Sequence, residues 1–393
     1  MKDNQAKYPQ LRFKGFTDPW EKRKLGEIAK VQGGGTPSSS NSEYWDGGIN
    51  WFTPTEVSNS GYLSESNRKI SELGLAKSSA KVLPVGTVLM TSRAGVGDMG
   101  ILTQEAATNQ GFQSLIPDEG VPSYFLYSMQ QSISRQANRL ASGSTFTEIS
   151  GKQVAKIPEW IPTSHEERRK VGDFFANLDN LIAVNQRKLA KLKELKQGYL
   201  QKLFPKNGSK FPQLRFAGFA DAWEQHKVSE LADRYDNLRV PITASERVTG
   251  ETPYYGANGI QDYVKGFTHN GEFVLVAEDG ANDLQNYPVQ YVDGKVWVNN
   301  HAHVLQAKEE IVDNKFLTNA LKHTNIKPYL VGGGRAKLNA DVMMKINFKV
   351  PTLPEQVQIG KFFDNLNHLI TLHQRKLEKL QELKKGYLQK MFC

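Results

Sequence analysis

Cysteine is almost absent from this chain, because Cys393 is the one cysteine among 393 residues. An intramolecular disulfide is therefore excluded, as is usual for proteins of reducing compartments. No apolar run approaches the roughly 20 residues that a membrane-spanning helix needs. The opening residues, MKDNQAKYPQ, are polar and lack the apolar core of a secretory signal. We therefore expect a cytoplasmic protein with no membrane partner.

The common motifs of catalysis are also missing. The chain has no Walker A loop, no H-E-x-x-H and no G-x-S-x-G. It also lacks the Asn-Pro-Pro-aromatic tetrapeptide with which amino-methylating DNA enzymes hold a flipped base. Gly95–Gly100 fits G-x-G-x-x-G, but the following Ile101-Leu102-Thr103 favours a strand, so a hairpin turn suits it better than a dinucleotide site. We expect no catalytic activity from this chain alone.

A metal site is not favoured either. His301 and His303 are two residues apart, so they share one face of a predicted strand. They lack a clear carboxylate or cysteine partner in the sequence, and zinc in proteins needs three or four such ligands. We predict neither a metal nor a cofactor bound by this chain itself.

Basic residues are in excess, with 50 Lys and Arg against 41 Asp and Glu, for a formal net charge of +9. Such a charge favours a polyanionic partner, because Lys and Arg that neutralise phosphates release condensed counterions. Charge alone leaves a nucleic-acid-binding protein and a merely basic protein equally open.

The chain contains internal repeats. Phe174–Phe204 and Phe362–Phe392 are identical at about two-thirds of their positions without a gap. PQLRFKGFTDPWE at Pro9–Glu21 returns as PQLRFAGFADAWE at Pro212–Glu224. SGSTFTEISGKQVAKI, which ends at Ile157, matches GGGRAKLNADVMMKI, which ends at Ile346, more loosely. The repeated plan divides the chain into two units of about half its length each, and units of that length are domains and not the stacked repeats of a solenoid.

Both long repeats predict amphipathic helices, since their apolar residues recur at spacings of three and four. A lone helix of this length needs a partner for its apolar stripe, and antiparallel pairing of the two copies would create a pseudo-two-fold axis. Asn185 and His373 occupy matched positions beside the stripe, where a polar residue can fix the register of a helix pair, but we expect both to face water. The exposed basic residues repeat as well, which an ordinary pair of core helices does not require. We therefore predict a partner protein that docks on Lys188, Lys191, Lys376 and Lys379.

The regions between the repeats, roughly 22–141 and 225–332, differ from each other and read as mixed α/β. Val292-Asp293-Gly294-Lys295 predicts a hairpin with an Asp-Gly turn. Loops rich in Gly and Ser are frequent, and loops on a rigid scaffold usually carry recognition residues. Our candidates for base contacts are Arg93, Ser144, Thr145, Tyr255, Asn258, Arg335 and Lys337. For each of them, a phosphate contact or a role in the loop is an equal alternative.

The chain resembles the DNA specificity subunits of type I restriction–modification systems over nearly its whole length. GGGTPSSSNSEYWDGGINWFTP (Gly33–Pro54) and VLMTSRAGVG (Val88–Gly97) are similar to one common type of target-recognition domain, and YYGANGIQDYV, VLVAEDGAN and VNNHAHVL to another. EERRKVGDFFANLDNLI and PEQVQIGKFFDNLNHLI resemble the spacer helices of that family. This chain departs from the family's Glu-Gln pattern around Glu167 and Gln356, and has Asp179 where the second copy has Asn367.

The resemblance implies a non-catalytic adaptor that binds double-stranded DNA and reads a bipartite, asymmetric target. Two methyltransferase subunits would dock on the paired helices, and restriction subunits would join them. S-adenosylmethionine, ATP and Mg²⁺ would then belong to those partners.

We therefore expect an α+β fold with two mixed α/β target-recognition domains, joined by two long antiparallel, coiled-coil-like helices with pseudo-two-fold symmetry. The expected domains are 1–160 with the first lead, 161–206 as the central helix, 207–350 with the second lead, and 351–393 as the last helix. Two alternatives remain open: a self-contained DNA-modifying enzyme with atypical motifs, and an RNA-binding scaffold.

Overall fold

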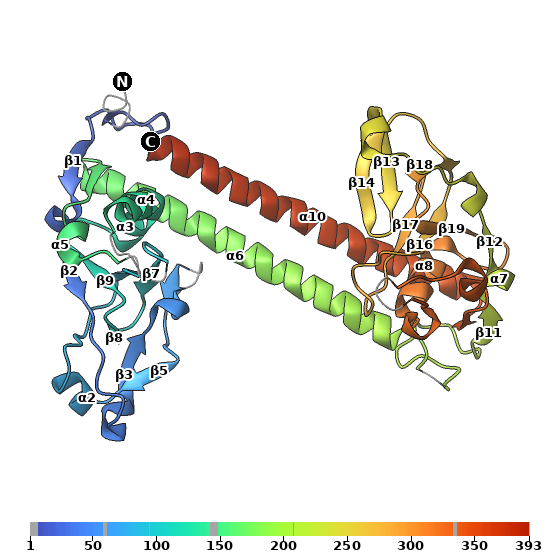
Figure 1. Ribbon diagram of the computed structural model, residues 1–393, viewed down its shortest axis with the longest axis horizontal. Coiled ribbons are helices and arrows are strands. Elements are labelled where there is room, and N and C mark those ends of the chain that lie inside the picture. The colour runs from blue at the N-terminus through green and yellow to red at the C-terminus, as the bar shows by residue number, and fades with distance from the viewer. Residues whose placement is uncertain are drawn as a thin grey trace. The chain divides into compact units, whose positions relative to one another are not determined.

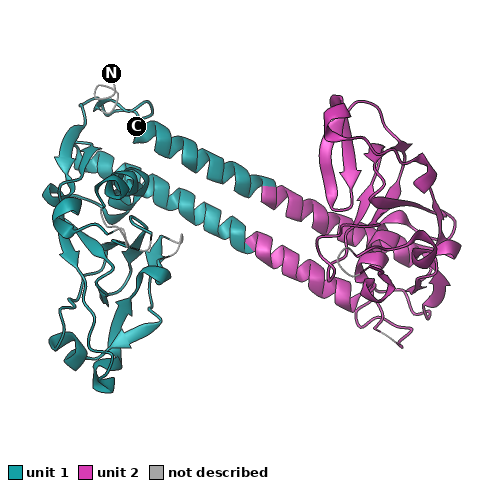
Figure 2. Ribbon diagram, in the orientation of Figure 1, with its two compact units in different colours: residues 1–187, 375–393 teal, residues 188–374 magenta. Residues whose placement is uncertain are grey.

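The computed structural model describes residues 7–57, 61–93, 95–141, 148–206, 208–332 and 336–392. The chain forms two compact units (Figure 2). Unit 1 comprises residues 1–187 and 375–393, and unit 2 comprises residues 188–374. The expected fold class is confirmed: the protein is α+β, with two mixed α/β regions and two long helices, α6 (His165–Lys202) and α10 (Leu353–Met391). Each long helix contributes to both units.

Unit 1 contains a five-stranded sheet in the order β2-β9-β6-β7-β4 and a three-stranded sheet in the order β5-β3-β8. Figure 1 labels several of these strands, among them β2, β9, β7, β3 and β5. Separately, β1, which follows the first lead, pairs with β10, the strand just before α6. The strands are β1 (Glu21–Lys24), β2 (Ala29–Gly33), β3 (Trp45–Phe52), β4 (Tyr62–Leu63), β5 (Arg68–Ile70), β6 (Val88–Met90), β7 (Met99–Leu102), β8 (Ala106–Thr108), β9 (Gln113–Pro117) and β10 (Pro158–Ile161). The short helices are α2 (Glu72–Ala76), α3 (Ser123–Ser128), α4 (Gln130–Leu140) and α5 (Gly151–Val154).

Unit 2 contains two four-stranded sheets, ordered β12-β19-β16-β17 and β14-β13-β18-β15, and the pair β11 and β20. The strands are β11 (Glu224–Lys227), β12 (Ala232–Arg234), β13 (Thr249–Gly256), β14 (Gly259–Val264), β15 (His269–Asn270), β16 (Phe273–Ala277), β17 (Val289–Val292), β18 (Lys295–Val298), β19 (Ala302–Ala307) and β20 (Asn347–Val350). The short helices are α7 (Val228–Leu231), α8 (Asn314–His323) and α9 (Ala340–Met343).

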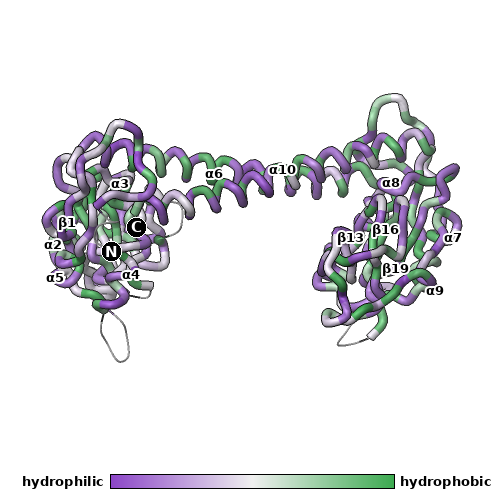
Figure 3. Tube along the Cα trace, turned by 90° about the horizontal axis from the view of Figure 1, so that it is seen from above, coloured by the Kyte–Doolittle hydropathy of each residue, from purple (hydrophilic) through white to green (hydrophobic). Residues whose placement is uncertain are grey.

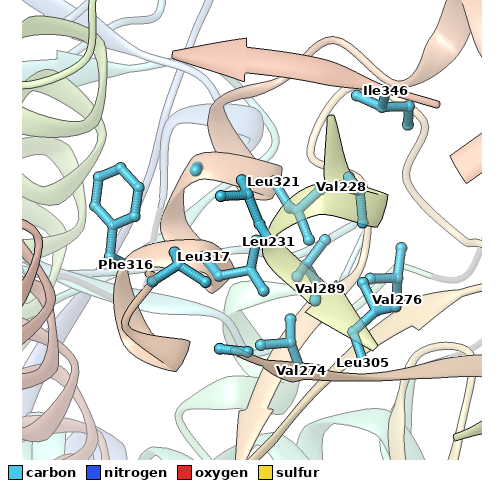
Figure 4. Close-up of a cluster of buried hydrophobic side chains, with 14 of the residues drawn as sticks. Val228, Leu231, Val274, Val276, Val289, Leu305, Phe316, Leu317, Leu321 and Ile346 are labelled. Atoms are coloured by element: carbon cyan, nitrogen blue, oxygen red, sulfur yellow. The ribbon is translucent and has the colours of Figure 1, made fainter. Parts of the chain in front are cut away.

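One short helix packs a core onto a sheet in each unit. In unit 2, α8 places Leu317 and Leu321 against residues of the β16 sheet in a cluster of fully buried side chains (Figure 4). In unit 1, Phe125 and Leu126 of α3 join Val88 and Met90 of β6 in the corresponding cluster. Burial of a large apolar side chain contributes about 1.5–3 kcal/mol, so these clusters hold the sheets to the long helices.

The long helices have the expected amphipathic character, since hydrophilic and hydrophobic residues alternate along both (Figure 3). Within each unit, the beginning of one helix packs antiparallel to the end of the other: Asp179 contacts Lys384 in unit 1, and Tyr199 contacts Phe362 in unit 2. In the part of the chain that the structure describes, no helix is long and apolar enough to cross a membrane.

The glycine-rich stretch at Gly95–Gly100 forms the predicted turn and no dinucleotide loop. It connects the antiparallel neighbours β6 and β7, and its last glycine, Gly100, already lies in β7, so no helix opens there. Gly95 and Gly97 have φ angles of 107° and 93°, which L residues with a side chain rarely adopt.

Two local predictions are wrong. The strands on either side of Asp293-Gly294 do not pair with each other: β17 pairs with β16, and β18 pairs with β13 and β15 in the other sheet. The turn therefore passes the chain from one sheet to the next, because both sheets offer strand edges that a local pattern cannot show. Asn185 is also buried, at 3% exposure, and its side-chain amide donates to the Leu181 carbonyl.

Candidate functional site

The repeated leads make the same buried ion pair in both units. The guanidinium of Arg12 donates two hydrogen bonds of 2.6 and 2.7 Å to the carboxylate of Glu167. Arg215 binds Glu355 in the same way, at 2.8 and 2.7 Å. Both glutamate side chains are only 1% exposed. Bidentate pairs of this kind fix distance and angle together, so each lead is locked to the beginning of one long helix.

Each lead also contacts the end of the other long helix. The Leu11 N–H donates to the Lys390 carbonyl at 3.2 Å, and both Phe13 and Tyr387 meet the ring of Phe174 edge to face. The matched residues of the second copy repeat these contacts: Leu214 with Lys202, and Phe216 and Tyr199 with Phe362. The leads therefore clamp the crossing of the two helices within each unit. Sequence reasoning found the leads but not this role, although a repeated Arg and a repeated Glu were a visible signal.

The ion pairs also correct the alignment at the helix entries. Glu167 and Glu355 are equivalent, so the position that corresponds to Gln356 is Arg168. Gln356 donates to the carbonyls of Ile311 and Pro351, and Arg168 donates to those of Gly120 and Pro162. Both residues therefore fasten the helix entry to a nearby loop.

The lysines proposed for subunit docking are exposed. Lys188, Lys191, Lys376 and Lys379 all present their side chains to solvent. Lys191 lies 3.3 Å from Glu194, a surface pair that contributes little stability. Their charges are therefore accessible to a partner.

Each unit contains a junction in which a returning segment binds the end of a central strand. In unit 1, the Ile149 N–H donates to the carbonyl of Ser92, just after β6. In unit 2, the Leu338 N–H donates at 2.7 Å to the carbonyl of Glu278, just after β16. Ile149 and Leu338 occupy matched positions in the loosest of the three repeats. We call these two places the strand-end junctions; they relate the two variable regions, which cannot be aligned by sequence.

Arg93, the one described candidate recognition residue of unit 1, lies next to the strand-end junction of that unit. Arg93 follows Ser92, is half-buried, and has its Nε beside Gly111. Within the described ranges, no ion pair between Arg93 and a carboxylate is found. Ser144 and Thr145 lie outside the described residues.

In unit 2, the structure brings Asn258 and Lys337 to the same strand end. The Asn258 side chain donates to the Gly280 carbonyl and accepts from the Asn282 N–H, both at 2.9 Å, so it braces two loops. Lys337 lies 2.9 Å from a carboxylate oxygen of Glu278. Tyr255 is half-buried in β13, and burial raises its pKa. Arg335 lies outside the described residues.

A charge network that sequence reasoning missed supports this strand end. Glu278 binds both Lys337 and Arg239, the latter at 2.7 Å. Burial opposes the ionisation of Glu278, but the hydrogen bonds from Arg239 and Lys337 outweigh it, and its pKa is lowered. Asp236 accepts from His303 at 2.7 Å, and this bond likewise lowers the pKa of Asp236 against the effect of burial.

His303 belongs to this network, whereas His301 binds a neighbouring carboxylate. His303 is 1% exposed and binds Asp236 and the Leu338 carbonyl, whereas His301 lies 2.5 Å from Asp279. The sequence did not reveal these carboxylate partners, because they lie far from the histidines along the chain. Among the residues that the structure describes, no group of three or more His, Cys, Asp or Glu could hold a metal ion.

Comparison with known proteins assigns a family to this architecture. The family described as "Type I restriction modification DNA specificity domain" matches residues 17–194 and 220–382, one region from each copy of the duplicated plan. The crystal structure of a type I restriction-modification system S subunit from M. genitalium superposes with a TM-score of 0.72 at 15% identity, covering 98% of this chain and 99% of that one.

Curated relatives match parts of the chain more closely. A Haemophilus influenzae protein provisionally named a type I restriction enzyme specificity subunit is 44% identical over 42% of this chain and 42% of its own length. The specificity subunit of a type I restriction enzyme of Methanocaldococcus jannaschii is 36% identical over 42% of this chain and 38% of its own length. These matches thus span about two fifths of the relatives. Because the family match covers most of this sequence, the chain belongs to the type I restriction–modification DNA specificity domain family.

Proposed function

We propose that this chain is a non-catalytic subunit that reads a bipartite, asymmetric target in double-stranded DNA and directs methyltransferase and restriction subunits to it. The observation that carries the proposal is the pair of strand-end junctions: the same hydrogen bond recurs in both units, but the surrounding loops differ in sequence. A repeated support with two different sets of loops suits a target with two different halves.

The proposed domains are 1–160 and 207–350 as the two readers, and 161–206 and 351–393 as the helices between them. Arg93 is the strongest candidate for a base contact, since Arg can bind guanine O6 and N7 with both arms and its charge is not neutralised by a described carboxylate. Lys337 and Asn258 already bind groups in their own unit, which favours a role in shaping the loop. Ser144, Thr145, Tyr255 and Arg335 remain candidates.

The exposed lysines of the long helices support the docking of two methyltransferase subunits. The two helix repeats present the same basic residues in both units, so two copies of one acidic surface could bind equivalent places. In this proposal, S-adenosylmethionine, ATP and Mg²⁺ are bound by the partner subunits and not by this chain.

The proposal is tested by a genome-wide map of methylated adenines in the host, with the gene present and with the gene deleted. The expected result is that one gapped, asymmetric motif loses its methylation on deletion. A complementing allele with residues 22–141 exchanged for those of another family member is the matched control, and it should change one half of the motif only. If deletion alters no motif while the partner methyltransferase is expressed and active, the proposal is wrong.

A further inference from the structure

The strand-end junctions relate the two variable regions residue by residue. Ser92 and Glu278 correspond, because the carbonyl of each accepts a hydrogen bond from its returning segment. The N–H of Ser92 donates to the Gly111 carbonyl, and the N–H of Glu278 donates to the His301 carbonyl, both at 2.8 Å. Gly111 and His301 therefore occupy the same place, just before β9 and β19. The strands continue in the same register, with the matched pairs Val88–Leu115 and Val274–Leu305.

Arg93 corresponds to Asp279 in this register, since each directly follows the junction residue. The two positions carry opposite charges. A carboxylate repels the phosphates of DNA, so Asp279 by itself does not suit the place that Arg93 has in unit 1. His301 covers this carboxylate: its Nδ1 lies 2.5 Å from an oxygen of Asp279. An ionised carboxylate only accepts hydrogen bonds, so Nδ1 carries the hydrogen.

The two units fill this place from opposite strands. In unit 1, the long side chain of Arg93 comes from the end of β6, and the residue across from it is a glycine. A Cβ on Gly111 would lie 3.3 Å from the Nε of Arg93. In unit 2, the residue after β16 is the short Asp279, and the ring comes from His301 across from it. The imidazole of His301 thus lies at the strand end where unit 1 has the side chain of Arg93.

The ring of His301 is held at one nitrogen and open at the other. Its side chain is 36% exposed. Among the described residues, none hydrogen-bonds to its Nε2, and this atom is not buried. The His301 N–H donates to the Asn299 side-chain oxygen at 2.8 Å, which fixes the backbone that carries the ring. A side chain that is already ordered loses little entropy on binding, so this arrangement suits a contact with a ligand.

We propose that His301, positioned by Asp279, contacts the edge of a base in the part of the DNA target that unit 2 reads, at the place that Arg93 has in unit 1. This inference rests on the proposed function. The contacting atom is Nε2. It accepts from a base amino group when the ring is neutral, and it donates to a base oxygen or N7 when the ring is protonated. In both forms, Nδ1–H remains on Asp279.

The experiment uses the complete methyltransferase complex that contains the full chain, acting on DNA libraries randomised at each position of the target. His301→Ala should relax one base position in one half of the methylated motif, with discrimination at that position reduced about tenfold or more. His301→Gln is the second variant, for the case in which His301→Ala fails to fold, and it should alter the preference at the same position. Arg93→Ala is the matched change in unit 1, and any position that it relaxes should lie in the other half.

Asp279→Ala tests the positioning role, because it leaves the ring in place but removes the group that orients it. It should relax the same base position as His301→Ala, and the double variant should be no more relaxed than His301→Ala alone. An unchanged motif in folded His301 variants, or a uniform loss of methylation across all sequences, would refute the base contact. If the wild-type complex methylates no bipartite motif, the proposed function itself is wrong, and this inference is wrong with it.

Discussion

The two clamps between lead and helix allow a matched test of buried charge in one molecule. Replacement of Arg215 by Ala leaves the carboxylate of Glu355, 1% exposed, without the two hydrogen bonds that neutralise it. Loss of one partner of a buried pair costs about 3–5 kcal/mol. We expect Arg215→Ala to destabilise unit 2 by about that amount.

The equivalent change in unit 1 should cost less. The indole N–H of Trp20 lies 3.4 Å from Glu167 and can still donate to it after Arg12→Ala. The matched Trp223 has a buried indole nitrogen without a hydrogen-bond partner in the described part of the chain. One retained hydrogen bond is worth about 1 kcal/mol, so Arg12→Ala should be milder than Arg215→Ala by that order.

Native-state hydrogen exchange is the suitable assay, because two units need not unfold in one step and exchange reports the opening of each unit separately. The amides to follow are those at the beginning of α6 and of α10. The double variant Arg215→Met with Glu355→Met is the control, and it should be more stable than Arg215→Ala, since an apolar pair leaves no buried charge. A loss below about 1 kcal/mol for Arg215→Ala would refute the reasoning about burial.

Four further predictions follow from the structure. Burial raises the pKa of Glu159 to about 7, against an unfolded value near 4.5. The folded state therefore binds a proton that the unfolded state has lost, and the stability of the protein should fall as the pH rises from about 4.5 to 7. Glu159→Gln should remove this pH dependence and stabilise the protein at pH 8 by up to about 3 kcal/mol, as measured by urea unfolding. Arg93→Ala should relax one base position of the target at about 1–3 kcal/mol if Arg93 reads a base, whereas uniform weakening across DNA sequences in a binding assay would indicate a phosphate contact. Charge reversal of the exposed lysines Lys188, Lys191, Lys376 and Lys379 should weaken the complex with the methyltransferase subunits, as judged on a sizing column. An unchanged complex would contradict docking at this surface. Deletion of one heptad from both α6 and α10 removes about 10.5 Å of helix. It should shorten the gap in the methylated motif by about three base pairs or abolish methylation. Methylation of the original gapped motif would show that the helices do not set the length of the gap.

Much of the plan of this protein follows from its sequence. The 3.6-residue periodicity located both long helices, because the apolar residues of a buried helix face recur every three to four residues in the sequence. The duplication was visible directly, since the clamp residues of the leads and helices are the same in both copies. The missing motifs led us to expect no catalytic activity, whereas the expectation of a DNA reader came from the resemblance of particular motifs to the specificity family.

Other features depend on contacts between residues far apart in the chain, and only the tertiary structure decided them. Asp293-Gly294 has the local signature of a hairpin, yet β17 and β18 lie in different sheets, because pairing depends on which strand edges are available. Asn258 and Lys337 are of residue types that often contact bases, and they lie in glycine-rich loops. Their side chains nevertheless bind groups of their own unit: Asn258 binds Gly280 and Asn282, and Lys337 binds Glu278.

The exchange of Asp179 for Asn367 shows the same division most clearly. In the sequence it is one difference between two similar helices. In the structure, the aspartate neutralises Lys384, and the asparagine stands beside a lysine that no described carboxylate neutralises. Local spacing determines which residues share a helix face. Whether a charged side chain is neutralised depends on which residues of other segments lie within hydrogen-bonding distance of it.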